Sequence, residues 1–135
     1  YSTDTTTMVT KGAATATKYN DSGHNSSTIG YFSGGNLSGN TARTTVCNSL
    51  TFSTDTTAQV TKGALSQARG YGGTANSSTI GYYGGGYSGN DGDGVTTDDG
   101  LTYSTDTTAQ VTKGVLTSSR SHLAGFQGGS GTQQI

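Results

Sequence analysis

A six-residue motif recurs along the chain at a constant interval. YSTDTT begins at Tyr1, FSTDTT at Phe52 and YSTDTT again at Tyr103, so each occurrence follows the last by 51 residues. A fixed period of this size is typical of repeat architectures, in which each copy is one supersecondary unit stacked against its neighbours. The period divides the chain into copies at residues 1–51 and 52–102 and a partial third copy at 103–135.

Further matches fill the interval between the motifs. The first two copies align without a gap, and the third departs from them after Arg120. Because positions that are kept in several copies serve the repeat itself, we interpret the recurring charged residues and glycine pairs as structural. The set is Asp4, Asp55, Asp106, Lys18, Arg69, Arg120, Gly34, Gly35, Gly85 and Gly86.

The composition favours strands and turns. Thr, Ser and Gly make up about half of the chain, Pro and Trp are absent, and hydrophobic residues account for 28%. Thr is β-branched and fits a pleated strand, whereas Gly permits turns. Charged residues are only 11%, so little self-repulsion extends the chain, and we expect an ordered all-β protein.

Short strands are predicted where apolar and polar residues alternate. From the end of the first copy through the second, the predicted elements are strands at residues 50–53, 58–61 and 78–83, the last being the most apolar, and a turn at 54–57. Residues 64–69 fit either a short extended piece or one helical turn. Residues 87–100 are rich in Gly and Asp and are predicted to form a loop.

The order of these elements resembles the kelch repeat. The matching residues are Arg69, Ile80-Gly81-Tyr82-Tyr83, Gly85-Gly86, and Leu101-Thr102-Tyr103 with Asp106. They are most similar to the Thr- and Gly-rich kelch-like repeats of marine tailed-phage and bacterial surface proteins. The resemblance implies that each copy is one four-stranded blade of a β-propeller. The chain departs from the family pattern in lacking its Trp and in a longer interval from Tyr103 to Asp106.

About 2.5 such units do not make a closed ring, because propellers have roughly 4–8 blades. Open strand edges invite further pairing. We therefore expect the fold to be completed either by flanking repeats of a longer chain or by a homo-oligomer. A head-to-tail contact that does not close would instead grow a filament.

Two tyrosines vary between the copies and are candidates for ligand binding. Tyr71 and Tyr87 align with Asn20 and Asn36 of the first copy and are flanked by glycines. Exposed aromatic rings of this kind stack on sugar faces, a mode of recognition that needs little charge. The alternative is that they are ordinary surface tyrosines.

A cluster of aspartates suggests a weak calcium site. Asp91, Asp93, Asp98 and Asp99 stand close together in sequence, and Ca²⁺ prefers carboxylate oxygens. The register differs from that of a calcium loop, and the first copy has no carboxylates there. The alternative is a solvated acidic loop, and no other cofactor is expected.

Several function classes lack sequence support. The only cysteine is Cys47, and His24 and His122 do not recur, so neither a zinc site nor the Tyr-His-Cys copper site of a kelch-type oxidase is expected. The sequence contains neither a nucleophile elbow nor a P-loop, so we expect no enzyme. A net charge of −1 argues against nucleic-acid binding, and no apolar run approaches about 20 residues, so no membrane span is expected.

The remaining class is a non-enzymatic surface protein. We expect an extracellular or virion-surface repeat protein that acts in attachment, such as a phage tail-fibre or adhesin module, with cell-surface glycans as partners. The alternative is a structural subunit of a filament, fibre or sheath, whose many Ser and Thr residues would accept O-glycans. Because the first residue is Tyr rather than Met, we also expect a processed product or a stretch of a longer protein.

Overall fold

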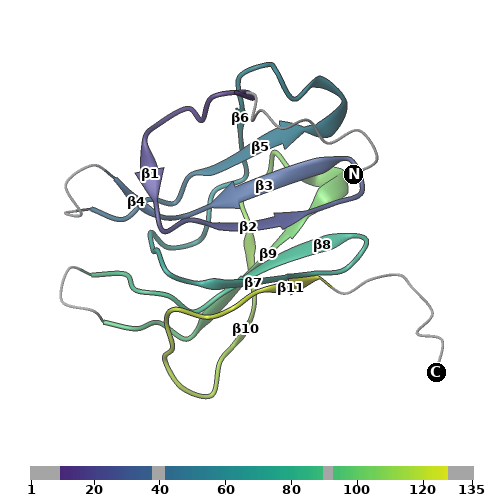
Figure 1. Cartoon of the computed structure of the whole chain (residues 1–135). Coiled ribbons are helices and arrows are strands. Elements are labelled where there is room, and N and C mark those ends of the chain that lie inside the picture. The colour runs from purple at the N-terminus through teal and green to yellow at the C-terminus, as the bar shows by residue number, and fades with distance from the viewer. Residues whose placement is uncertain (1–9, 38–41, 90–92, 128–135) are drawn as a thin grey trace.

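The computed structural model describes residues 10–37, 42–89 and 93–127 and is all-β, which confirms the expected class (Figure 1). The strands of these residues form three small sheets, none of which closes on itself. No helix within the described ranges is long and apolar enough to cross a membrane.

Two sheets make up most of the molecule. Sheet 1 contains, in spatial order, β2 (Ser22–Asn25), β3 (Ile29–Ser33), β5 (Cys47–Thr51) and β6 (Val60–Lys62), all antiparallel. Sheet 2 has the order β10 (Val111–Val115), β9 (Thr97–Thr102), β8 (Ile80–Gly84), β7 (Gly73–Asn76) and β11 (Phe126–Gln127). Its β7–β11 pair is parallel and the others are antiparallel.

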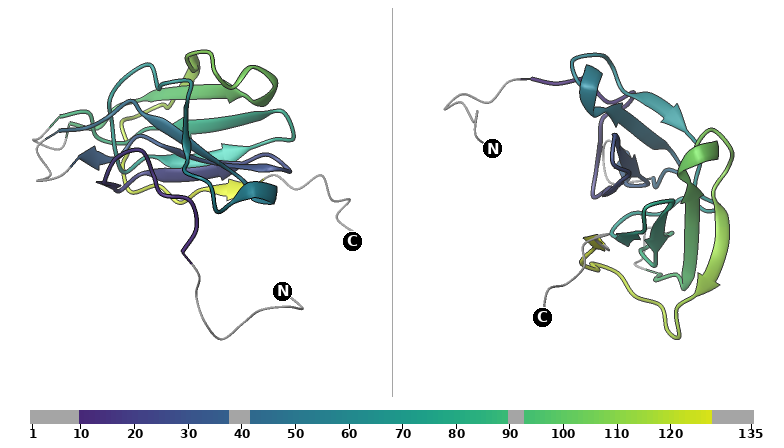
Figure 2. Two further views of the ribbon diagram at one scale, coloured as in Figure 1. Left: turned by 90° about the horizontal axis from the view of Figure 1, so that it is seen from above. Right: turned by 90° about the vertical axis from the view of Figure 1, so that its right-hand side faces the viewer.

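Shorter elements flank the strands of the two sheets. β1 (Lys18–Tyr19) pairs with β4 (Asn36–Leu37) in a two-stranded sheet. Two 3₁₀ turns, η2 (Phe52–Thr54) and η3 (Tyr103–Thr105), follow β5 and β9. Figure 2 shows the two larger sheets side by side, with β2 of sheet 1 next to β7 of sheet 2.

Corresponding strands begin at the interval of the sequence motif. β2 and β7 begin at residues 22 and 73, β3 and β8 at 29 and 80, and β6 and β10 at 60 and 111. Sheet 1 nevertheless crosses the boundary between the first two sequence copies, because its last strand, β6, lies in the second copy.

The structure corrects the predicted elements in several places. The strand predicted at 58–61 begins at Val60 and ends at Lys62. The strand predicted at 50–53 ends at Thr51, because η2 begins at Phe52. The loop predicted at 87–100 contains the start of β9, which fills the space between β8 and β10 and makes Asp98 and Asp99 strand residues. Strand β7 is absent from the predicted elements, because Gly73–Asn76 has no large apolar residue to mark its buried side.

The core lies between the sheets and is small. Tyr31, Cys47 and Leu101 are buried together, with Ile29 and Tyr103 packed against them. The rings of Tyr31 and Tyr103 stack with centroids 5.3 Å apart. Sheet 2 therefore contributes Leu101 and the start of η3 to cover the face of sheet 1.

A second contact joins the Lys62-Gly63 pair to the STDTT turn that follows it in the sequence. Lys62 forms an ion pair with Asp106, with Nζ 3.0 Å from Oδ1. The backbone N–H of Gly63 donates to the Asp106 carbonyl at 2.7 Å, and that of Gln110 donates to the Ala64 carbonyl at 2.8 Å. Tyr31 adds a hydroxyl bond to the same carboxylate, from Oη to Oδ2 at 2.9 Å.

The same contact occurs one copy earlier. Lys11 forms an ion pair with Asp55 at 3.2 Å, and the Gly12 N–H donates to the Asp55 carbonyl at 2.6 Å. The Gln59 N–H donates to the Ala13 carbonyl at 2.9 Å. The aspartate of the motif thus binds the preceding Lys-Gly pair in both places, and Asp4 lies outside the described residues.

Stability is expected to fall between pH 6.5 and pH 4 because of His24. This imidazole is 6% exposed, stacks on Tyr31 and has no hydrogen bond to Nε2 in the described part of the chain. Burial lowers its pKa from 6.5 to about 4. The unfolded chain takes up a proton in this window and the folded chain does not, so acidification favours unfolding by up to about 3 kcal/mol.

Urea unfolding at pH 7.5, 5.5 and 4 measures this effect. His24→Ala introduces the residue that the second copy has at this position, Ala75. The variant is expected to be less stable at every pH, and its free energy of unfolding should depend less on pH between 6.5 and 4. An equal slope in both proteins would contradict the role given to His24.

Candidate functional site

An aromatic cluster brings together the two tyrosines selected from the sequence. The ring centroids of Tyr71 and Tyr87 are 5.8 Å apart, and His122 lies 4.6 Å from the first and 5.6 Å from the second. Both tyrosines are half-buried rather than exposed, because they pack on each other and on His122, which is itself exposed. We call Tyr71, Tyr87 and His122 the aromatic cluster.

A cation borders the cluster. The Cζ atom of Arg43 lies 5.8 Å from the Tyr71 ring centroid, within cation–π range. Its Nη2 donates to the carbonyl of Gly89 at 3.2 Å, whereas Nε and Nη1 are buried without a hydrogen bond to any described residue. Arg43 therefore places two donors beside the rings that no described residue uses.

The backbone of the cluster has an uncommon conformation. Asn20, Tyr71 and His122 occupy one position of the repeat, and all three have positive φ, at 59°, 61° and 55°. The Tyr71 N–H donates to the Asn20 carbonyl at 3.0 Å, and the His122 N–H donates to the Tyr71 carbonyl at 2.8 Å. Asn tolerates this region, but Tyr and His rarely enter it, so the aromatic residues carry a strain of about 1 kcal/mol.

The predicted calcium ligands that the structure describes, Asp93, Asp98 and Asp99, do not meet in one place. Asp91 lies outside the described residues, Asp93 is exposed, and Asp98 and Asp99 are consecutive in β9, so their side chains point to opposite faces. Asp99 is fully buried rather than solvated, and its carboxylate accepts bonds from Ser66 and Thr112. Burial raises the pKa of Asp98.

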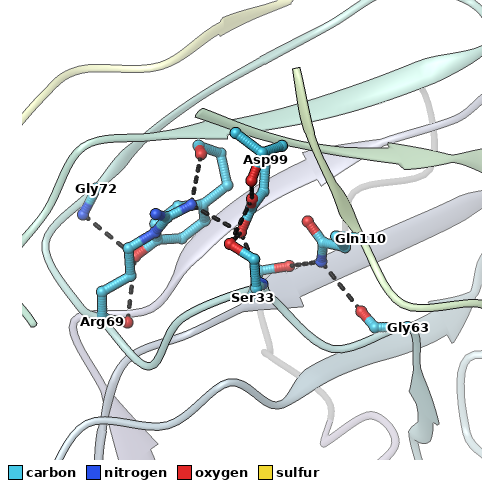
Figure 3. Close-up of polar contacts among 9 residues, drawn as sticks. Ser33, Gly63, Arg69, Gly72, Asp99 and Gln110 are labelled. Atoms are coloured by element: carbon cyan, nitrogen blue, oxygen red, sulfur yellow. Dashed lines mark hydrogen bonds and ion pairs between the residues drawn. The ribbon is translucent and has the colours of Figure 1, made fainter. Parts of the chain in front are cut away.

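Asp99 is instead the partner of Arg69. The Arg69 Nη2 lies 2.9 Å from Asp99 Oδ2 and donates to the Tyr83 carbonyl at 3.1 Å (Figure 3). Both side chains are fully buried. Burial lowers the pKa of the Arg69 guanidinium, and the Asp99 carboxylate opposes that effect. The pair is an internal link between β9 and the segment before β7, with no surface left for a ligand.

Lys18 occupies the same position in the first copy. Its Nζ donates to the carbonyl of Phe32 at 2.8 Å, as Arg69 does to Tyr83, and lies 3.6 Å from Asp21. Asn48 stands where the second copy has Asp99 and donates to Thr15 Oγ1 at 2.7 Å. Arg120, the third basic residue, is exposed.

The recurring glycine pairs are required by the backbone. Gly34, Gly35, Gly85 and Gly86 have φ of 68°, 101°, 65° and 100°. The Gly35 N–H donates to the Arg69 carbonyl at 2.9 Å, and the Gly86 N–H to the Arg120 carbonyl at 2.7 Å. The pairs therefore join each copy to the next.

Two members of the site are not selected by the sequence. His122 aligns with Tyr71, and that shared repeat position is the available signal that the two are neighbours. Arg43 gives no signal, because it stands where the second copy has Gly94. Within the described ranges, no group of three His, Cys, Asp or Glu side chains lies close enough to hold a metal ion.

Comparison with known proteins gives no further identification. No protein-family model and no curated protein sequence matches the chain.

Proposed function

We propose that this chain is a non-enzymatic attachment module of a cell or virion surface and that it binds glycans at the aromatic cluster. The observation that carries the proposal concerns one repeat position with positive φ. The first copy has Asn20 there, whereas the second and third copies have the aromatic residues Tyr71 and His122. A residue kept in a sparsely populated conformation is a recognised mark of function rather than of stability.

The chemistry of the cluster suits a sugar. Aromatic rings offer apolar area with little loss of side-chain entropy, and the tyrosine hydroxyls and the imidazole add hydrogen-bonding groups at the ring edges. The Arg43 guanidinium lies over the Tyr71 ring and holds it in place beside Tyr87. A net charge of −1 fits recognition that does not depend on electrostatic attraction.

The scaffold in this proposal is a set of kelch-like propeller blades. Support comes from the matching strand order of the two sheets, in which β2 and β7 hold corresponding places and lie next to each other. Such a fold places the loops that carry the aromatic cluster at one end of the ring.

Tyr71→Asn tests the binding site with little change in the fold. Asn stands at this position in the first copy with φ of 59°, so the backbone is expected to keep its conformation. The backbone hydrogen bonds of residue 71 to Asn20 and His122 should also remain. Relief of strain offsets the lost ring contacts, so the free energy of unfolding should change by less than about 1 kcal/mol. Glycan affinity is expected to fall at least about tenfold, by the loss of one stacking surface.

A glycan array followed by calorimetry on the best ligand measures the effect. Tyr87→Asn, which also restores the residue of the first copy, should weaken binding similarly, whereas Tyr19→Ala should not, since Tyr19 is exposed in β1 and outside the cluster. Equal affinity in wild type and Tyr71→Asn would rule out this site, and a wild-type chain that binds no glycan would rule out the ligand class.

A further inference from the structure

One Lys-Gly pair has no STDTT turn against it among the described residues. Lys113, Gly114 and Val115 correspond to Lys62, Gly63 and Ala64. A Cβ at Gly63 would overlap the carbonyl of Thr108, whereas a Cβ at Gly114 would meet no described atom within 4 Å. Gly63 is buried and Gly114 is exposed. The glycine of the third pair therefore leaves room for a backbone that no described residue supplies.

The adjoining face of sheet 2 is also uncovered. Tyr82, Asp98 and Leu116 line a cavity of about 410 Å³ and are half-buried. Their counterparts on sheet 1 are fully buried; they are Tyr31, Cys47 and Leu65. The difference arises because Tyr103 and Asp106 lie over sheet 1, and no described residue takes that place over sheet 2.

The sequence contains a second segment of the kind that covers sheet 1. Tyr103-Ser104-Thr105-Asp106-Thr107-Thr108 supplies the ring on Tyr31 and the carboxylate on Lys62. Tyr1-Ser2-Thr3-Asp4-Thr5-Thr6 is identical to it, whereas the copy at residue 52 begins with Phe. The charges match as well, because Lys113 is basic like Lys62 and Asp4 is acidic like Asp106.

We propose that the edge Lys113-Gly114-Val115 and the adjoining face of sheet 2 dock residues 1–6 of a second copy of this chain. Asp4 of that copy pairs with Lys113 and accepts the Gly114 N–H and the Tyr82 hydroxyl, and its Tyr1 ring stacks on Tyr82. Each bond repeats one that joins the two sheets within the chain. The contact is head-to-tail, so it builds a ring or a filament rather than a two-fold dimer.

Gly114→Ala separates association from folding. The added methyl meets no described atom of its own chain, so the circular dichroism spectrum should match that of wild type and the unfolding midpoint should not fall below it. In the complex, the methyl would overlap the carbonyl of Thr6 of the second chain. This overlap would repeat the one between a Cβ at Gly63 and the carbonyl of Thr108. The association constant is expected to fall at least about tenfold.

Sedimentation equilibrium on the 135-residue chain measures the association. The weight-average mass of wild type should rise above 13.6 kDa with concentration, whereas Gly114→Ala should stay near that value at higher concentrations. The control is Gly23→Ala at an exposed position of β2, where a Cβ meets nothing closer than 3.5 Å and association should match wild type. A wild-type chain that stays monomeric up to about 1 mM, or a Gly114→Ala chain that associates equally, would overturn the proposal.

A charge exchange tests which segments meet. Lys113→Asp and Asp4→Lys should each weaken self-association, because each places like charges at the junction. An equimolar mixture of the two variants should form mixed pairs, in which the lysine introduced at position 4 of one chain meets the aspartate introduced at position 113 of the other. Failure of the mixture to associate better than either variant alone would count against this pairing, whatever the outcome of the glycan assays.

Discussion

Replacing Asp99 by asparagine is expected to lower the free energy of unfolding by about 3–5 kcal/mol, the usual cost of leaving one member of a buried ion pair alone. The Arg69 guanidinium is fully buried, and its Nη2 lies 2.9 Å from the Asp99 carboxylate. An amide would also leave one acceptor oxygen where the carboxylate has two that accept from Ser66. Urea denaturation followed by circular dichroism at pH 7 measures the loss.

Asp98→Asn is the matched control for this prediction. It makes the same chemical change at the preceding residue of β9, where the carboxylate is half-buried and burial raises its pKa. Removing that charge should leave stability unchanged or slightly higher. The double variant Arg69→Met/Asp99→Asn removes both charges and should be more stable than Asp99→Asn alone. Equal losses of stability in Asp99→Asn and Asp98→Asn would contradict a stabilising role of the Arg69–Asp99 ion pair.

Replacing Gly63 by alanine is expected to cost about 4 kcal/mol, more than the usual 1–3 kcal/mol of overpacking in a core. The new methyl would overlap the carbonyl of Thr108, which is backbone and cannot rotate away. The STDTT turn would have to move, and the Gly63 N–H bond to Asp106 and the Lys62 ion pair would be lost with it. Thermal and urea unfolding measure the effect.

Gly114→Ala again provides the comparison, because it makes the same substitution at the corresponding residue, where a Cβ meets no described atom. Any Gly→Ala change lowers the entropy of the unfolded chain. The difference in free energy of unfolding between the two variants therefore measures the contact between the Lys-Gly pair and the turn alone. A stable Gly63→Ala variant would mean that the two sheets separate without loss, and it would contradict the interlocked arrangement.

The sequence predicted the class of fold and part of the strand pattern. The apolar residues Ile80, Tyr82 and Tyr83, followed by a run of glycines, located β8 within one or two residues. It missed β7, whose small residues pair with β8 and β11 without burying a large side chain. It also read β9 as a loop, because aspartate in a strand is unusual unless a distant cation neutralises it, and Arg69 is 30 residues away in sequence.

The candidate site was predictable only in part. Comparison of the copies selected Tyr71 and Tyr87, because both replace asparagine of the first copy. It could not select Arg43, which depends on how the chain after β4 returns past the Tyr71 ring. The repeat also fixed which glycines matter, but only the structure distinguishes Gly63, which lies against another backbone, from Gly114, which does not.

The main-chain bonds from Tyr71 to Asn20 and from His122 to Tyr71 involve no side-chain atoms. The residue at this position can therefore change, among types that adopt positive φ, without altering how successive copies are joined. On the proposed function, single substitutions at residues 20, 71 and 122 would change which ligand is bound. The same three positions are suitable for introducing new side chains while the backbone stays unchanged.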